Sequence, residues 1–445
     1  MKATKKIQNA WAMYDWANST YNLVIGTAIF PIFYSAVTRR EENGVATDGA
    51  IGDDVMFFGS VFKNTEVLSY SLALGMALVC ILAPTLAGVA DYLGRKKVFM
   101  RWFCYLGALS CASLYFFDEA HLERSMLSII FACVGFWCSY AFSNSFLPEL
   151  AEPSEQDKLS AKGFSFGYVG SIILLLINLG MVMSQDTGAE KVEMMRWSFV
   201  TVAVWWIGFA HYTFYHLPEK KKNNKFDSSI IGNGFRELRG VWRNLKKTAR
   251  LKRYLLSFFV FSMGVQTIMQ MASLFGTKEV IRIDENGQQV VGLADGQLIV
   301  AVILVQIIAI PGAMLFSYAS RKLGNLQTLK IALIVWGCVC LFAYFVVHTP
   351  VEFYIAAGAI GFIMGGTQAL ARSTYSKFLP VTTDNASYFS FFDVTEKVGL
   401  IIGLLAFGYL EGAFGSMRMS ILALITFFVI GFILILFVPK EEKEV

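Results

Sequence analysis

The sequence predicts an all-α polytopic membrane protein built from two similar halves. Hydrophobic residues make up 56% of the 445 residues and charged residues only 16%, whereas a soluble domain carries about 25% charged residues. The mean hydropathy is +0.54. The apolar residues come in blocks of about 20, the length of helix that crosses a bilayer. The alternating pattern typical of a transmembrane barrel does not occur.

A sequence pattern occurs twice, about half a chain length apart. Phe-Leu-Pro begins at Phe146 and again at Phe378, and each copy is followed by Phe-Ser-Phe, at Phe164 and at Phe389. In apolar surroundings, such a repeat indicates a duplicated helix bundle, here two pseudo-repeats of six helices each. In transporters the substrate site lies between repeats of this kind.

Twelve apolar blocks are long enough to cross a membrane. The predicted spans are 12–37, 66–90, 98–117, 125–147, 161–184, 197–216, 254–276, 295–316, 327–347, 352–372, 386–411 and 417–438. The first span is expected to be retained rather than cleaved as a signal peptide, because Asp15 and Asn18 interrupt it and no small-residue cleavage site follows.

Lys and Arg predict the orientation and the domain organisation. If both termini are cytoplasmic, the inside segments carry about three times as many Lys and Arg as the outside segments. We therefore expect an integral protein of a bacterial inner (plasma) membrane with both termini in the cytoplasm. Residues 1–216 and 254–445 would form the two six-helix bundles, joined by a linker at 217–253.

The linker is basic and amphipathic. Apolar residues recur at steps of three and four from Ile231 through Phe235, Leu238 and Trp242 to Leu245, among many Lys and Arg. This pattern favours a helix lying on the anionic inner surface of the membrane. Recognition by a calmodulin-like or regulatory partner is the alternative.

The cysteines indicate neither a disulfide framework nor a metal site. All seven lie inside apolar segments, without a CxxC motif or a His/Cys cluster at ligand spacing: Cys80, Cys104, Cys111, Cys133, Cys138, Cys338 and Cys340. We expect no cofactor and no metal. The net charge of +5 does not require a nucleic-acid partner, because the linker and the orientation bias account for it.

The turn after the second span carries a specific motif. Residues 88–97 read Gly-Val-Ala-Asp-Tyr-Leu-Gly-Arg-Lys-Lys. Gly88 permits close helix contact, Asp91 caps or pairs at a helix end, and Gly94 permits the tight turn. Arg95 and Lys96 hold the loop at the inner face. This turn resembles the signature turn of the major facilitator superfamily. The matching stretch 317–324 has lost the acid.

Other segments narrow the resemblance. Residues 14–19, Tyr-Asp-Trp-Ala-Asn-Ser, are similar to the opening signature of the "unknown major facilitator" family, which includes the fungal autophagy-related vacuolar amino-acid effluxers. Residues 144–150, 163–170 and 365–373 fit the same family. The resemblance covers nearly the whole chain. It implies the twelve-helix major facilitator fold and a solute transporter, in particular an amino-acid exporter. The intact repeat suggests that one chain is a complete transport unit and works as a monomer.

Polar residues inside the spans mark the candidate site, because they are costly in hydrocarbon. Asp15, Asn18 and Asn22 share one face of span one. We interpret Asp15 either as an N-terminal cap or gate latch, or as a substrate ligand. Asn144, at the end of span four, belongs to the matching family motif. In a major facilitator fold, spans one, four, seven and ten line the central cavity.

Spans seven and ten add amides and a guanidinium. Gln266 and Gln270, four residues apart in span seven, either hold helices together or bind substrate. Arg372 follows Gln368 by one turn at the end of span ten. Its guanidinium either snorkels to the inner surface, or meets an anionic substrate or Asp15.

Span eleven carries the most informative group. Lys397 lies about 16 Å along the helix from Ala386, near mid-bilayer. Asp393 lies one turn before it, so the two could neutralise each other and leave Glu396 without an ion-pair partner in the helix. We hypothesise that Lys397 or Glu396 couples the movement of a proton, or another ion, or holds the carboxylate of a substrate.

The predicted function is therefore secondary active transport of a small solute, coupled to protons, by alternating access of the two halves in the lipid bilayer. Two alternatives are a membrane-embedded enzyme and a receptor that binds without transporting. No HExxH, GxSxG or phosphate-loop motif occurs, which argues against an enzyme and excludes a pump driven by a nucleotide.

Overall fold

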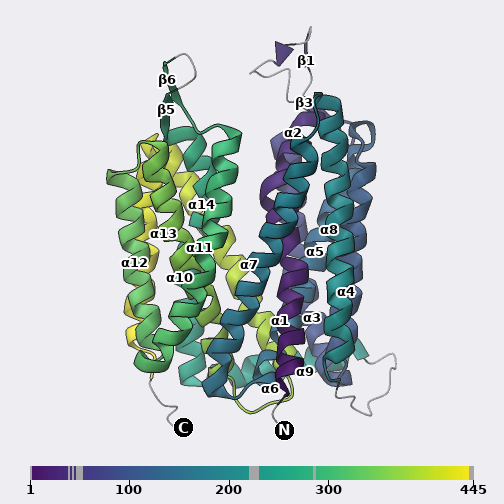
Figure 1. Cartoon of the computed structure of the whole chain (residues 1–445). Helices are drawn as coiled ribbons and strands as arrows, with labels where there is room; N and C mark the ends of the chain where they lie inside the picture. The colour runs from purple at the N-terminus through teal and green to yellow at the C-terminus, as the bar shows by residue number, and fades with distance from the viewer. Residues whose placement is uncertain are drawn as a thin grey trace. The chain divides into compact units, whose positions relative to one another are not determined.

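Long helices make up almost all of the computed structural model, which describes residues 3–38, 41–42, 45–46, 54–219, 230–283 and 287–439 (Figure 1). The helical segments of the first half are α1 Lys5–Thr20, η1 Tyr21–Ala28, α2 Ile29–Thr38, α3 Asn64–Leu93, α4 Lys96–Ser113, η2 Leu114–Phe116, η3 Glu119–His121, α5 Leu122–Asn144, α6 Leu147–Leu150, α7 Pro153–Met183 and α8 Gly188–His216. Those that follow are α9 Ile230–Lys247, α10 Ala249–Glu279, α11 Asp295–Leu323, α12 Asn325–Phe345, α13 Pro350–Phe378, α14 Asn385–Phe414 and α15 Met417–Leu436.

Every predicted span coincides with a long helical segment, and eleven of these are long and apolar enough to cross a membrane. The exception is α8, which contains the predicted span 197–216. Its mean hydropathy is lowered by residues such as Trp205, Trp206 and His211. The structure thus confirms a polytopic helical membrane protein, while the count of twelve spans stays a prediction.

Three short antiparallel hairpins connect helices, in the two polar segments between spans one and two and between spans seven and eight. They pair β1 Glu41–Glu42 with β2 Val45–Ala46, β3 Asp54–Phe57 with β4 Ser60–Lys63, and β5 Ile281–Ile283 with β6 Gln289–Val291. Strands β5 and β6 extend beyond the helix ends of their own half (Figure 1).

The chain divides into two compact units. The N-unit comprises Thr4–Asn144 and Val169–Gly234. The C-unit consists mainly of Ser145–Tyr168 and Phe235–Val445. Helix α7 therefore contributes its first half to the C-unit and its second half to the N-unit. The predicted domains, which assign all of 1–216 to the first bundle, remain a prediction of how the repeats are organised.

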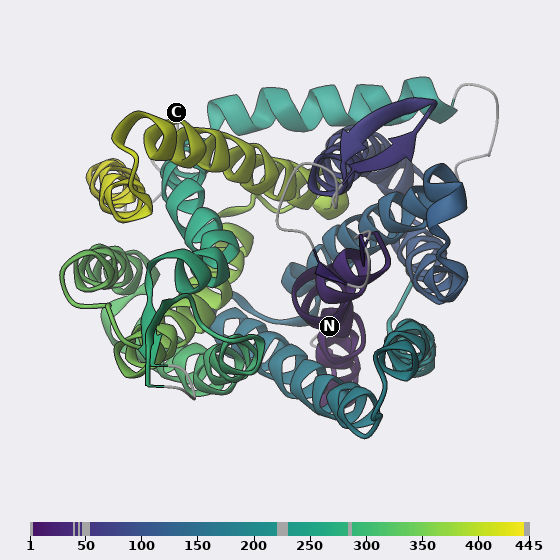
Figure 2. The ribbon, with the colours of Figure 1, turned by 90° about the horizontal axis from the view of Figure 1, so that it is seen from above.

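The predicted linker contains a helix, α9, seen from its side in Figure 2, where most long helices are seen nearly end-on. Within the C-unit, Val241 and Leu245 are buried, and the ring of Trp242 lies 5.6 Å from that of Phe391. Trp242 and Phe235 are nevertheless about half exposed. This arrangement fits the predicted surface helix. The basic run at 220–229 lies outside the described residues.

Glycines allow α11 and α13 of the C-unit to pack with their backbones in contact. A Cβ atom at Gly361 would collide with the carbonyl oxygen of Val305, and one at Gly365 with that of Ala309. Small residues at such crossings are typical of membrane helices, because van der Waals packing rather than the hydrophobic effect holds the helices together. Gly361 and Gly365 therefore set the close approach of α13 to α11.

We predict that Gly365→Ala destabilises the protein by about 1–3 kcal/mol, because its methyl group has no room against α11. Thermal unfolding of the detergent-solubilised protein measures the change. The matched control is Gly337→Ala in α12, where no atom lies within 4 Å of an added Cβ. Equal melting temperatures for the two variants would contradict the packing argument.

Candidate functional site

Charged side chains meet in the middle of α14, within the C-unit. The Lys397 ammonium donates a hydrogen bond to Glu396 Oε2 at 2.7 Å, and Gln266 of α10 donates to Glu396 Oε1 at 2.5 Å. The Lys397 side chain is 2% exposed and that of Glu396 is 16% exposed. Glu396 thus has both its oxygens bound inside a membrane-spanning helix bundle, and it remains partly accessible.

Asp393 is the second carboxyl group in this part of α14. It is buried, and neither of its oxygens has a hydrogen-bond partner among the described residues. It lies in the field of Lys397, of Glu396 and, more weakly, of Arg372. The Lys397 ammonium thus donates a hydrogen bond to the adjacent Glu396, while its interaction with Asp393 is electrostatic. Helical spacing alone missed this pair because neighbouring residues point in different directions unless a long side chain bends back.

Close packing of α10 on α14 brings Gln266 to this cluster. An added Cβ at Gly399 would lie 2.9 Å from Ser262 Oγ, and one at Gly403 would lie 2.7 Å from the carbonyl oxygen of Met263. These α14 glycines let the two helices approach next to the charged residues. The second predicted amide of span seven, Gln270, is exposed one turn further along α10.

Arg372 is buried rather than extended to the surface. It is 2% exposed. Its Nε donates to Ser160 Oγ at 2.9 Å and its Nη2 to the Ser160 carbonyl oxygen at 2.8 Å. The guanidinium also lies 4.2 Å from the ring centroid of Phe164. The snorkelling alternative is therefore wrong, because two oxygens and a ring of α7 hold the guanidinium inside the C-unit.

The neighbouring amide, Gln368, also contacts α7. Its Oε1 accepts a hydrogen bond from the Tyr168 hydroxyl at 3.0 Å. Its Nε2 faces the Met269 sulfur of α10 at 3.5 Å. Gln368 is partly exposed, so its amide lies where three helices meet and remains accessible to a ligand.

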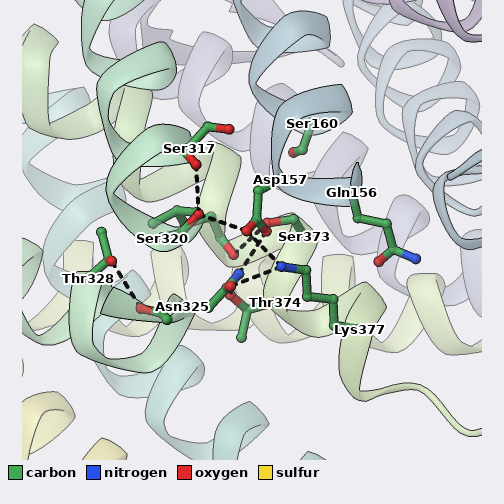
Figure 3. A network of polar contacts seen from close by, with 12 residues as sticks. Gln156, Asp157, Ser160, Ser317, Ser320, Asn325, Thr328, Ser373, Thr374 and Lys377 are labelled. Atoms are coloured by element: carbon green, nitrogen blue, oxygen red, sulfur yellow. Dashed lines mark hydrogen bonds and ion pairs between the residues drawn. The ribbon is translucent and has the colours of Figure 1, made fainter. Parts of the chain in front are cut away.

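A polar network that the sequence analysis missed centres on Asp157 of α7 (Figure 3). Asp157 Oδ2 accepts from Lys377 Nζ at 2.6 Å and from Ser320 Oγ at 2.7 Å, and Oδ1 accepts from Asn325 Nδ2 at 2.8 Å. Asn325 also donates to Thr374 Oγ1 at 2.9 Å and accepts from Lys377 at 2.9 Å. The Asp157 side chain is 1% exposed.

This network ties α7 to the ends of α11 and α13 and to the start of α12. Ser320 and Asn325 flank the second-half turn whose acid is missing from the repeat. An acid from another helix, Asp157, is hydrogen-bonded to that turn instead. In the sequence, the acid missing from the stretch 317–324 was the sign of this network, and it does not indicate which residue takes the place of that acid.

In the N-unit, the polar residues of span one differ in exposure. Asp15 and Asn18 are buried, whereas Asn22 is exposed. The cap interpretation of Asp15 is wrong, because α1 begins ten residues earlier at Lys5 and its N-cap is Thr4, whose Oγ1 accepts from the Ile7 N–H at 3.4 Å. Asn144, the last residue of α5, is also buried.

The turn between α3 and α4 has the geometry that its motif predicts. Gly94 has a φ of 66°, in the left-handed region that glycine tolerates, and the Arg95 N–H donates to the Ala90 carbonyl at 3.0 Å. Asp91 and Lys96 are buried. An added Cβ at Gly88 would collide with the carbonyl oxygen of Gly234. Gly88 therefore allows the first turn of α9 to pack against α3.

No metal site accompanies these residues. Within the part of the chain that the structure describes, no group of three or more His, Cys, Asp or Glu side chains lies close enough to hold an ion. The cluster on α14 and its neighbours on α10 and α13 provide two carboxyl groups (Asp393, Glu396), one ammonium (Lys397), one guanidinium (Arg372) and two amides (Gln266, Gln368). Such groups bind charged solutes and carry protons.

Comparison with known proteins gives consistent matches over the whole chain. The model of the family described as "Vacuole effluxer Atg22 like" matches residues 3–445. The chain is 28% identical over 446 residues to the MFS-type transporter YxiO of Bacillus subtilis, covering 100% of this chain and 97% of that protein. It is 23% identical over 484 residues to autophagy-related protein 22 of Saccharomyces cerevisiae, covering 94% and 89%.

Solved structures of major facilitator transporters share the fold. The fucose:proton symporter FucP of E. coli aligns with a TM-score of 0.69 at 14% identity, covering 98% of each chain. The proton:xylose symporter XylE aligns with a TM-score of 0.72 at 12% identity, covering 98% and 96%. These similarities confirm the predicted fold class. The relatives are transporters and effluxers, which confirms the prediction that the chain is not an enzyme.

We predict that Lys377→Met destabilises the protein by about 3 kcal/mol, because it leaves the Asp157 carboxylate buried without its cation. Asp157→Asn costs less, since Lys377 is 18% exposed and can be hydrated. In the double variant, most of the loss should be recovered. Thermal unfolding in detergent measures all three variants.

The matched control for this cycle is Lys278→Gln, which breaks the exposed ion pair of Lys278 with Glu411 at 3.2 Å. An exposed pair contributes less than about 1 kcal/mol. Losses that simply add in the Asp157/Lys377 double variant would show that the two groups do not depend on each other.

Proposed function

Because the chain belongs to the vacuole effluxer Atg22-like family, whose members resemble major facilitator transporters, we propose that it moves a small solute across a membrane by secondary active transport with alternating access. The chain is an integral membrane protein with multiple spans. We place it in a bacterial inner membrane with both termini in the cytoplasm. One chain would be a complete transport unit, because it contains both repeats.

The observation that carries this proposal is the charged cluster of α14. A charge buried in a membrane-spanning helix is costly, so such charges usually serve substrate binding, ion movement or proton relay. Here Lys397 and Glu396 form a buried pair at 2.7 Å, and Gln266 of α10 orients the carboxylate. A purely structural pair would need no partly exposed member, yet the Glu396 side chain is 16% exposed.

The proposed solute is an amino acid or a related metabolite, moved outward. Two features support this choice. Both signs of charge lie in one cluster, so the ammonium of Lys397 suits a solute carboxylate while a carboxylate such as Glu396 suits a solute ammonium. The family is also described as one of effluxers.

Proton coupling would use Asp393. Its two oxygens hydrogen-bond to none of the described residues, although the side chain is buried. Such a carboxyl group is less costly when it holds a proton than when it is charged. Solute binding at the neighbouring Glu396 and Lys397 would change the charge around Asp393, which links solute movement to proton movement.

We predict that Glu396→Gln and Lys397→Met each lower the flux of labelled amino acids from proteoliposomes by about tenfold or more, because removing one partner of a buried charge pair costs at least 2 kcal/mol. Asp393→Asn should retain exchange of solute but lose the response to an imposed pH gradient. Thermal unfolding shows whether each variant is folded.

The matched control is Glu411→Gln, a carboxyl group on the same helix that pairs with Lys278 near the helix end. Its flux should equal that of the wild type. Full activity of both Glu396→Gln and Lys397→Met would overturn the assignment of the site. Stabilisation of the wild type by amino acids without any flux would favour the receptor alternative.

A further inference from the structure

A groove opens between α7 and α8 within the N-unit. Its volume is about 540 Å³, inside the range of about 300–1,000 Å³ that is typical of small-molecule sites. Among the described residues its lining includes no charged side chain, so the groove is distinct from the charged cluster of α14. Leu174 of α7 lines one side, and the residues from α8 include Trp197, Thr201, Val204, Trp205 and Phe209.

The groove has the depth of one leaflet of a bilayer. It follows α8 from Trp197 to Phe209, a length of about 18 Å at 1.5 Å per residue, and the hydrocarbon core is about 30 Å thick. Trp197 is 43% exposed and begins the predicted span, where indoles mark the membrane interface. Val204, inside the groove, is 67% exposed. With the orientation proposed above, this leaflet is the outer one.

A hydroxyl and an amide interrupt the apolar wall. Thr201 Oγ1 lies 2.8 Å from Asn178 Oδ1 of α7 and 2.8 Å from the Ser198 carbonyl oxygen, and a hydroxyl has one hydrogen for these two acceptors. Asn178 is buried, and its Nδ2 has no hydrogen-bond partner among the described residues. Because buried amide donors are rarely left unpaired, the wall lacks an acceptor at this depth.

The aromatic part of the wall is fixed by its own contacts. The Trp205 ring stacks on that of Trp16 at 5.6 Å, and its Nε1 donates to the Trp16 carbonyl oxygen at 3.2 Å. The Phe209 ring lies 4.7 Å from that of Trp205. Fixed walls reduce the ordering cost of binding. A second membrane helix suits this wall less well than a flexible chain, because close helix pairs use small residues at the contact.

We propose that this groove binds a glycerophospholipid of the outer leaflet. One acyl chain lies along Val204, Trp205 and Phe209, and an ester carbonyl of the lipid accepts a hydrogen bond from the Asn178 amide beside Thr201. Thr201 lies about 6 Å along the helix from Trp197, so the polar pair is just inside the interface, where the ester groups of a phospholipid lie. The site holds a resident lipid and not the transported solute.

The first test fills the groove. Gly208→Trp places an indole in it, and no atom lies within 4 Å of an added Cβ at Gly208, so the variant should fold. The matched control is Ile81→Trp, at a position of α3 outside the groove that is 65% exposed. Native mass spectrometry of the full chain measures bound phospholipid. We expect affinity to fall about tenfold or more in Gly208→Trp alone; equal lipid binding by both variants would overturn the proposal.

The second test examines the ester group. Delipidated protein receives either a diacyl phospholipid or its diether analogue, which has the same chains and headgroup but no ester carbonyl. We expect the diacyl lipid to raise the melting temperature of the wild type more, because only its carbonyl can accept from Asn178 Nδ2. In Asn178→Leu the two lipids should give equal shifts. Equal shifts in the wild type would overturn the proposal.

The same mass spectra test the other possible occupant, a second copy of this chain. A dimeric wild type that becomes monomeric in Gly208→Trp would place the partner copy in the groove and overturn the lipid proposal. A monomeric wild type that carries phospholipid supports it. Both readouts record bound mass and require no transport, so failure of the proposed transport function would leave this result interpretable.

Discussion

A charge buried among membrane-spanning helices must find its partner within the protein, and the organisation of the C-unit depends on this constraint. The Asp157 carboxylate accepts hydrogen bonds from Lys377, Ser320 and Asn325, which brings the ends of four helices together. The Arg372 guanidinium is held by Ser160 in the same way. Because removing either partner would leave a buried charge, these contacts determine where α7 packs. Asp393, without a hydrogen-bond partner among the described residues, is the exception and for that reason the candidate for proton movement.

The two halves of helix α7 belong to different compact units. Polar contacts through Asp157 and Ser160 hold its first half in the C-unit. Backbone packing holds its second half in the N-unit, where an added Cβ at Gly170 would lie 2.7 Å from the Trp16 carbonyl oxygen. Each half of α7 is thus held in its own unit by a different kind of contact.

The two units offer different chemistry to a solute. The C-unit presents charged groups on α14, which can bind ionic groups and exchange protons. Span one of the N-unit presents the exposed Asn22 amide and Thr27 hydroxyl, which can donate and accept hydrogen bonds.

Local sequence determined the class of the protein, its long helical segments and the turn at Gly94, because hydrophobic block length and turn chemistry act over short distances. Gly94 therefore has the role that its sequence context indicates. Only the tertiary structure decided which charges pair. Lys397 binds Glu396, Arg372 binds Ser160, and Asp157 replaces the acid missing from the second turn. These choices depend on which helices meet at a given depth, a long-range property that no spacing within one helix contains.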